Sequence, residues 1–194
     1  MKEQIILGVD PGTSITGFGI IKSSTKKIDL IEMGVIHLSK LDDHPLKLKK
    51  IFESVLELID KYNPDILAIE APFYGKNVQS MLKLGRAQGV CIAAALYRSI
   101  PVNEYSPKKI KQSITGNGNA SKEQVSSMLQ SMLKFEGHPT HLDATDGLAA
   151  AVCHFIQNSN TSLTKSTSNK AKSKSKTKSW STYLNENPNK IIKK

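Results

Sequence analysis

Short apolar runs and sharp breaks alternate over the first forty residues. Residues 5–10 are mostly apolar and stop at Pro11-Gly12, which predicts a buried strand that ends in a tight turn. Two further apolar runs, 18–22 and 28–38, are separated by Lys26-Lys27. Strands joined by such short connections pair with their neighbours, so we expect an antiparallel meander.

From residue 48 onward the spacing becomes that of helices alternating with short strands. Apolar residues from 48 to 62 recur at intervals of three and four, which predicts a helix that Asn63-Pro64 ends. Residues 66–69 predict a strand with Glu70 at its end. The remaining pattern predicts a helix over 78–98, a strand over 102–106, a helix from Pro107, a helix from Ser121 to 135 and a last helix over 141–155. The order indicates an α/β fold, a mixed sheet flanked by helices.

Positive charge is concentrated near the end of the chain. The 194 residues hold 27 Lys and Arg against 17 Asp and Glu, a net charge of +10. Residues 158–194 hold nine lysines and one acid, so +8 lies there and only +2 in residues 1–157. This Ser-, Thr- and Asn-rich segment has too little apolar surface to fold. We expect a folded domain over 1–157 and a disordered basic tail over 158–194. The tail contains an apolar cluster that is a docking motif, a set of stacking residues for nucleic acid, or incidental: Trp180, Tyr183 and Leu184.

The apolar pattern excludes several classes of protein. The longest near-apolar run, 89–96, is far shorter than the roughly 20 residues of a membrane span, so we expect no membrane partner. The run after Met1 soon meets Asp10, so we expect no signal peptide. Cys91 and Cys153 lie far apart in apolar helical patterns, and we expect buried thiols in a cytoplasmic protein.

Four acidic residues fall at the ends of predicted elements. Asp10 ends the first strand, and Glu70 follows the strand over 66–69. Asp143 and Asp146 lie three residues apart, on one face of the first turn of the last helix. Carboxylates that converge from separate elements bind hard divalent cations, with Mg²⁺ or Mn²⁺ favoured where no Cys or His set lies nearby. Two such ions about 3.5–4 Å apart support hydrolysis of a phosphodiester.

Three of these acids also have structural explanations. Asp10 precedes Pro-Gly and can simply begin a turn, while Asp143 and Asp146 have the spacing of a helix-capping pair. Glu70 is harder to explain in this way, because it directly follows an apolar strand, where burial of a charge is costly. The alternatives stay open for the single residues, whereas the set of four indicates a metal site.

Four motifs run in order through the predicted domain. They are Gly8-Val-Asp-Pro-Gly-Thr-Ser-Ile-Thr-Gly-Phe-Gly-Ile20, Ala68-Ile-Glu-Ala-Pro-Phe73, Leu82-Lys-Leu-Gly-Arg-Ala-Gln-Gly89 and His141-Leu-Asp-Ala-Thr-Asp-Gly-Leu-Ala149. Together they resemble the crossover junction endodeoxyribonuclease RuvC family, from about residue 4 to residue 155. The resemblance implies a ribonuclease H-like fold and a homodimer. It also implies Mg²⁺-dependent resolution of four-way (Holliday) junctions by paired symmetric nicks, in DNA recombination and repair, alongside a branch-migration complex of the RuvA and RuvB type.

The resemblance also implies roles for individual residues. The family's metal-binding catalytic acids are matched by Asp10, Glu70, Asp143 and Asp146. Lys111 and Lys122 match basic residues that hold phosphate near the scissile bond, and Phe73 matches an aromatic that contacts junction bases. From the residues alone, each lysine also fits a solvated surface charge, and Phe73 also fits an aromatic packed under its loop.

Three other functions share parts of this pattern. A sugar kinase or actin-like ATPase has a similar Asp-x-Gly-Thr turn, but it needs two related domains, which residues 1–157 cannot supply. A ribonuclease H-like enzyme acting on RNA shares the acids but gives no reason for the motif over 82–89. DNA binding without catalysis conflicts with clustered acids, which repel phosphate unless cations bridge them. The sequence therefore favours a metal-dependent, structure-selective DNA endonuclease.

Overall fold

The computed structural model describes residues 3–24, 27–72, 77–135 and 142–165, with side chains described up to residue 159. The chain divides into two compact units, residues 1–161 and 162–194. Nearly all of the second unit falls outside the described residues. No helix in the described ranges has the length and apolar character needed to span a membrane.

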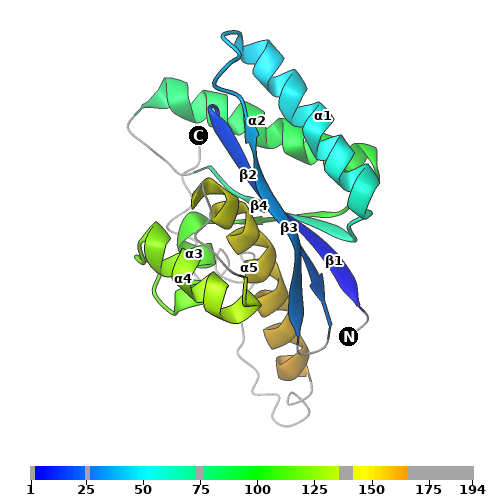
Figure 1. Ribbon diagram of the computed structural model, residues 1–194, viewed down its shortest axis with the longest axis vertical. Helices are drawn as coiled ribbons and strands as arrows, with labels where there is room; N and C mark the ends of the chain where they lie inside the picture. The colour runs from blue at the N-terminus through cyan, green and yellow to red at the C-terminus, as the bar shows by residue number, and fades with distance from the viewer. Residues whose placement is uncertain (1–2, 25–26, 73–76, 136–141, 166–194) are drawn as a thin grey trace, which may run out of the picture. The chain divides into compact units, whose positions relative to one another are not determined.

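A five-stranded mixed sheet in the order β3-β2-β1-β4-β5 forms the centre of the first unit (Figure 1). β1 (Gln4–Asp10), β2 (Ile15–Ser23) and β3 (Ile28–His37) form the predicted antiparallel meander. β4 (Ile66–Glu70) pairs with β1 in parallel, and β5 (Val102–Tyr105) pairs with β4 in parallel. The expected mixed sheet is confirmed.

The described chain has five helices: α1 (His44–Tyr62), α2 (Val78–Tyr97), α3 (Pro107–Thr115), α4 (Lys122–Leu133) and α5 (Leu142–Lys165). Several of their ends follow the sequence signals. Asn63 ends α1 in the left-handed conformation, with φ of 46°, and Pro107 lies in the first turn of α3. Ser121 caps α4 in a reciprocal capping box with Gln124.

The last helix is longer than its apolar pattern predicts. Asn158 Nδ2 lies 2.8 Å from His154 Nε2, and Ser159 Oγ donates to the Phe155 carbonyl at 2.9 Å. Polar contacts of this kind extend a helix without adding to its apolar periodicity. The expected end at residue 155 is therefore wrong, and residues 158–165, expected to begin the tail, are helical. The rest of the predicted tail, 166–194, lies outside the described residues.

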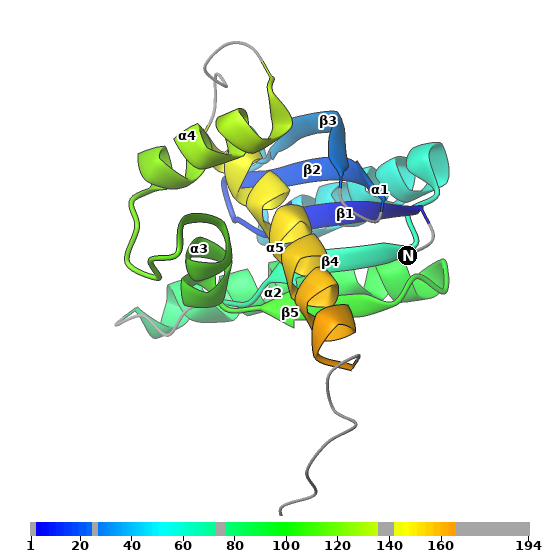
Figure 2. The ribbon, with the colours of Figure 1, turned by 90° about the horizontal axis from the view of Figure 1, so that it is seen from below.

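Helices cover both faces of the sheet (Figure 1). The side chains that face α1 and α2 include Leu7, Val9, Leu67 and Ile69. Those that pack with α3, α4 and α5 include Ile6, Ile66 and Ala68. Alternate residues of each strand thus serve opposite cores. Figure 2 shows α5 crossing the sheet, with α3 and α4 beside it.

Glycines allow α5 to approach the sheet closely. A Cβ atom at Gly147 would stand 2.5 Å from Phe18 Cα and 2.6 Å from the Gly17 carbonyl oxygen. A Cβ atom at Gly17 would overlap the carbonyl oxygen of Asp143. No larger residue fits at either position without moving the helix, so this contact sets the height of the first turn of α5 above the sheet.

Candidate active site

Two of the predicted acids lie side by side because they end neighbouring parallel strands. β1 and β4 pair with Val9 opposite Ile69, so Asp10 and Glu70 reach the same edge of the sheet. The first turn of α5 brings the other two predicted acids toward this edge through the glycine contact described above. Strand ends and a helix start therefore supply the four acids from three separate elements.

A cavity of about 240 Å³ gathers most of the predicted site residues. Its lining consists of Asp10, Glu70, Pro107, Ile110, Lys111, Lys122, Val125, Asp146 and Ala149. Three of the four acids and both predicted lysines thus share one cavity. Asp143 lies beside it, with its Oδ1 atom 3.5 Å from Lys122 Nζ. Phe73 lies outside the described residues.

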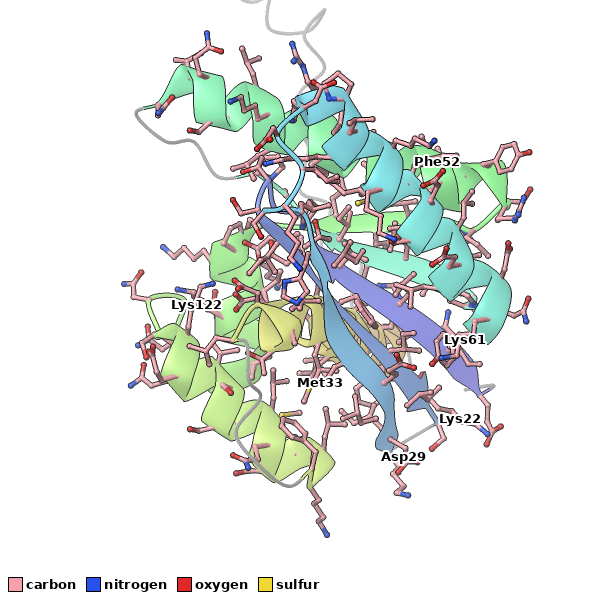
Figure 3. The ribbon with its side chains drawn as sticks, turned by 45° about the horizontal axis from the view of Figure 1, so that its top comes forward. Lys22, Asp29, Met33, Phe52, Lys61 and Lys122 are labelled. Atoms are coloured by element: carbon pink, nitrogen blue, oxygen red, sulfur yellow. The ribbon has the colours of Figure 1, made fainter. Side chains whose placement is uncertain are left out.

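Lys122 joins the start of α4 to the acids of α5. Its Nζ donates to Asp146 Oδ2, and Figure 3 shows the lysine at the N-terminal end of α4. Burial lowers the pKa of Lys122, but the hydrogen bond and charge of Asp146, with the charge of Asp143, outweigh burial and raise it overall. The spacing of the two aspartates therefore serves a shared ion pair, beyond any role in capping.

Thr16 closes the turn that follows Asp10, and the apolar pattern missed it. The Thr16 hydroxyl accepts a hydrogen bond from the Gly12 N–H and donates one to the Gly12 carbonyl, both at 3.2 Å. The hydroxyl of Thr16 thus holds the turn that Asp10 was considered to begin, while Asp10 lines the cavity. Because Thr16 is polar, β2 was expected to start at residue 18, whereas it starts at Ile15.

Burial and mutual repulsion raise the pKa values of these carboxyl groups. Burial, followed by the charges of Asp146 and Asp143, raises the pKa of Asp10 from its usual 3.8 to about 7, with Lys122 opposing. Burial and the charges of Asp10 and Asp146 raise the pKa of Glu70 from 4.5 to about 8, with Lys122 and Lys111 opposing. Burial also raises the pKa of Asp146. The charges of the neighbouring acids therefore add to the effect of burial on Asp10 and Glu70, and the lysines oppose it only in part.

The donor set fits a hard divalent cation. The carboxylates supply oxygen ligands, and the described cavity lining includes no Cys or His. Burial and, after it, the charges of neighbouring acids raise the pKa values of Asp10 and Glu70, and a bound dication would favour the charged form of both groups. Among the described residues, no group of three or more His, Cys, Asp or Glu side chains is arranged so that it could hold a metal ion. Lys122 is the cation that now contacts Asp146 and Asp143.

These pKa values predict how stability depends on pH when no metal is bound. A carboxyl group whose pKa is higher in the folded state stabilises the fold at low pH, and this stabilisation is lost as the pH rises through the folded-state value. For Asp10 and Glu70 the loss extends from about pH 4 to pH 7 or 8. In EDTA, wild type should therefore lose about 2 kcal/mol relative to Asp10→Asn between pH 5.5 and 8.5.

Calorimetric melting of both proteins across this pH range measures the difference. The exposed acid Asp42, replaced by Asn, is the matched control and should melt in parallel with wild type. Parallel melting of Asp10→Asn and wild type would show that Asp10 is ionised in the folded protein throughout this range.

The fold is similar to those of solved Holliday junction resolvases. Thermus thermophilus RuvC in complex with a Holliday junction substrate matches with a TM-score of 0.76 at 28% identity, over 81% of this chain and 96% of that chain. The yeast mitochondrial Holliday junction resolvase shares the fold, with a TM-score of 0.55 at 14% identity, over 81% and 86%. The mixed sheet with acids at one edge is that of a ribonuclease H-like nuclease.

Sequence comparison gives the family. The model of the crossover junction endodeoxyribonuclease RuvC matches residues 6–154. The enzyme of that name from Christiangramia forsetii is 59% identical over 98% of this chain and 94% of its own length. The one from Bacteroides fragilis is 54% identical over 98% and 97%. The chain belongs to the crossover junction endodeoxyribonuclease RuvC family, whose members are metal-dependent nucleases, and the resemblance seen in the four motifs is confirmed.

Proposed function

We propose that this enzyme resolves four-way (Holliday) junctions in DNA by paired symmetric nicks, in recombination and repair. The observation that carries the proposal is the cavity in which Asp10, Glu70 and Asp146 meet Lys111 and Lys122. Relatives bear the name of crossover junction endodeoxyribonuclease, and the Thermus protein was solved with a Holliday junction substrate. The agreement of site chemistry and family supports the same substrate here.

The metal we propose is Mg²⁺, two ions in each subunit, with Mn²⁺ as a substitute. The residues that would hold the ions are Asp10, Glu70, Asp143 and Asp146. Bound there, the ions would supply an activated water and stabilise the leaving oxygen of the phosphodiester. Release of Lys122 from Asp146 would free its ammonium group for the phosphate, next to Lys111. Phe73, three residues after Glu70, is proposed to stack on junction bases.

Paired nicks require two active sites, so we propose that the enzyme is a homodimer. α2 contains several small residues, which permit close approach of its backbone to the sheet or to a second subunit. A Cβ atom at Gly85 or Gly89 would meet nothing within 4 Å, and Val78 and Leu82 are exposed apolar residues of the same helix. These features support a dimer interface in which α2 packs against a second copy of the chain. We also propose a cytoplasmic enzyme that works alongside a branch-migration complex of the RuvA and RuvB type.

Cleavage of a synthetic four-way junction tests the function directly. With Mg²⁺ present, we expect two symmetric nicks with ligatable ends, formed at least about a hundredfold faster than any cut in a linear duplex of the same sequence. Omission of the metal, with EDTA added, is the control and should abolish the nicks. Equal cutting of junction and duplex would remove the structure selectivity that defines the proposal, and preferential cutting of an RNA–DNA hybrid would favour an RNA-directed nuclease.

A further inference from the structure

A second cavity, of about 310 Å³, also borders Glu70. Its described lining consists of Pro11, Glu70, Ala71, Pro72, Leu84 and Gln88. Glu70 lines this cavity as well as the active-site cavity, so the two adjoin the same carboxyl group. A nucleic acid strand whose phosphate lies against the acids extends past them in both directions. The second cavity is therefore placed to receive a part of the substrate next to the reacting phosphate.

Gln88 is the only described residue of this lining with a neutral polar side chain, and its amide is held in place. The residue is 8% exposed, and its Nε2 donates to Glu104 Oε2 of β5 at 2.6 Å. Because a carboxylate only accepts hydrogen bonds, Glu104 determines which end of the amide is the nitrogen. The amide makes no other hydrogen bond to the described residues. Its Oε1 and second N–H remain available as an acceptor and a donor.

This chemistry suits a nucleobase. The described lining carries no lysine or arginine, and Glu70 and Glu104 are acidic, so a phosphate would be disfavoured here. Proline, alanine and leucine side chains offer apolar surface to the flat face of a base. A carboxamide that presents a donor and an acceptor can pair with the edge of a base, as glutamine does with adenine.

We propose that Gln88, oriented by Glu104, reads the base of a nucleotide next to the scissile phosphate and so determines at which sequences the enzyme cuts. Gln88 is then a specificity residue, and Glu104 is a positioning residue that acts through it. The inference rests on the proposed junction cleavage and adds to it the residue that selects the cut site.

The test uses mobile-arm junctions that differ only in the bases flanking the scissile phosphate. Single-turnover rates are measured for all four bases at each flanking position. For wild type we expect rates that differ by tenfold or more at one of these positions. Gln88→Leu keeps the bulk but lacks both polar groups, so its rates should differ by less than about threefold across the four bases. A general loss of stability would slow all substrates alike and would not change these ratios.

Two further variants complete the experiment. Glu104→Gln can bond either end of the amide, so it should weaken the discrimination while Gln88 itself is intact; it also serves if Gln88→Leu does not fold. Gln4→Leu, at the opposite end of β1 from Asp10, is the matched control and should keep the wild-type ratios. The inference is overturned if wild type cuts junctions without base preference, or if the preference survives in both Gln88→Leu and Glu104→Gln. In either case junction cleavage itself would stand, whereas a wild type that cuts no junction would overturn the proposed function as well.

Discussion

Replacement of Asp10 by Asn should lower the rate of junction cleavage by at least about a thousandfold while leaving junction affinity within about threefold. The amide keeps the shape of the side chain but removes the charge that would hold a dication at the end of β1. Glu70→Gln and Asp146→Asn should behave in the same way, because both side chains line the same cavity. Binding is preserved because the lysines of the cavity remain, and fewer carboxylates then face the DNA backbone.

Single-turnover nicking of a radiolabelled junction with Mg²⁺ measures the rate, and fluorescence anisotropy in EDTA measures the affinity. Asp42 is an exposed acid that does not line the cavity. Asp42→Asn therefore controls for the loss of one negative charge and should retain normal nicking. A variant of Asp10, Glu70 or Asp146 that nicks within tenfold of wild type would exclude that residue from the site. Loss of affinity parallel to the loss of rate would instead indicate a role in substrate binding.

The sequence predicted the elements of this site better than the contacts between them. Strand β1 was evident because an apolar run stops at Pro11-Gly12, and Glu70 was evident because it directly follows an apolar strand. Because β1 and β4 run parallel to each other, Asp10 and Glu70 lie at the same edge of the sheet. Local patterns of this kind depend only on residues close in sequence, and they also located the cap at Ser121.

Two contacts that escaped prediction depend on residues far apart in the chain. The contact of Lys122 with Asp146 joins two helices, and the bond between Gln88 and Glu104 joins a helix to an edge strand. Neither pair has a spacing that a helix or strand would reveal. Thr16 was overlooked for a different reason. It is a buried polar residue of a strand in which periodicity favours apolar residues, and its hydroxyl bonds the backbone of Gly12 in the preceding turn.

Gly147 is the position at which packing and chemistry are most closely linked, and Gly147→Val should lower the nicking rate by at least about a hundredfold. Any side chain there meets the backbone of Gly17 and Phe18, so α5 must move away from the sheet. That movement carries the first turn of α5, with Asp143 and Asp146, away from Asp10. Overpacking of this kind also costs about 1–3 kcal/mol of folding stability.

The two effects separate when the rate is measured well below the melting temperature, with circular dichroism confirming that the variant is folded. Gly147→Ala, with a smaller side chain, should lose less activity than Gly147→Val, since the displacement of α5 grows with the added bulk. Ser127→Val places a branched side chain on the exposed face of α4 and should leave nicking unchanged. Normal nicking by folded Gly147→Val would show that the site tolerates a shift of α5, and that the acids are positioned by the bond to Lys122 rather than by the glycine contact.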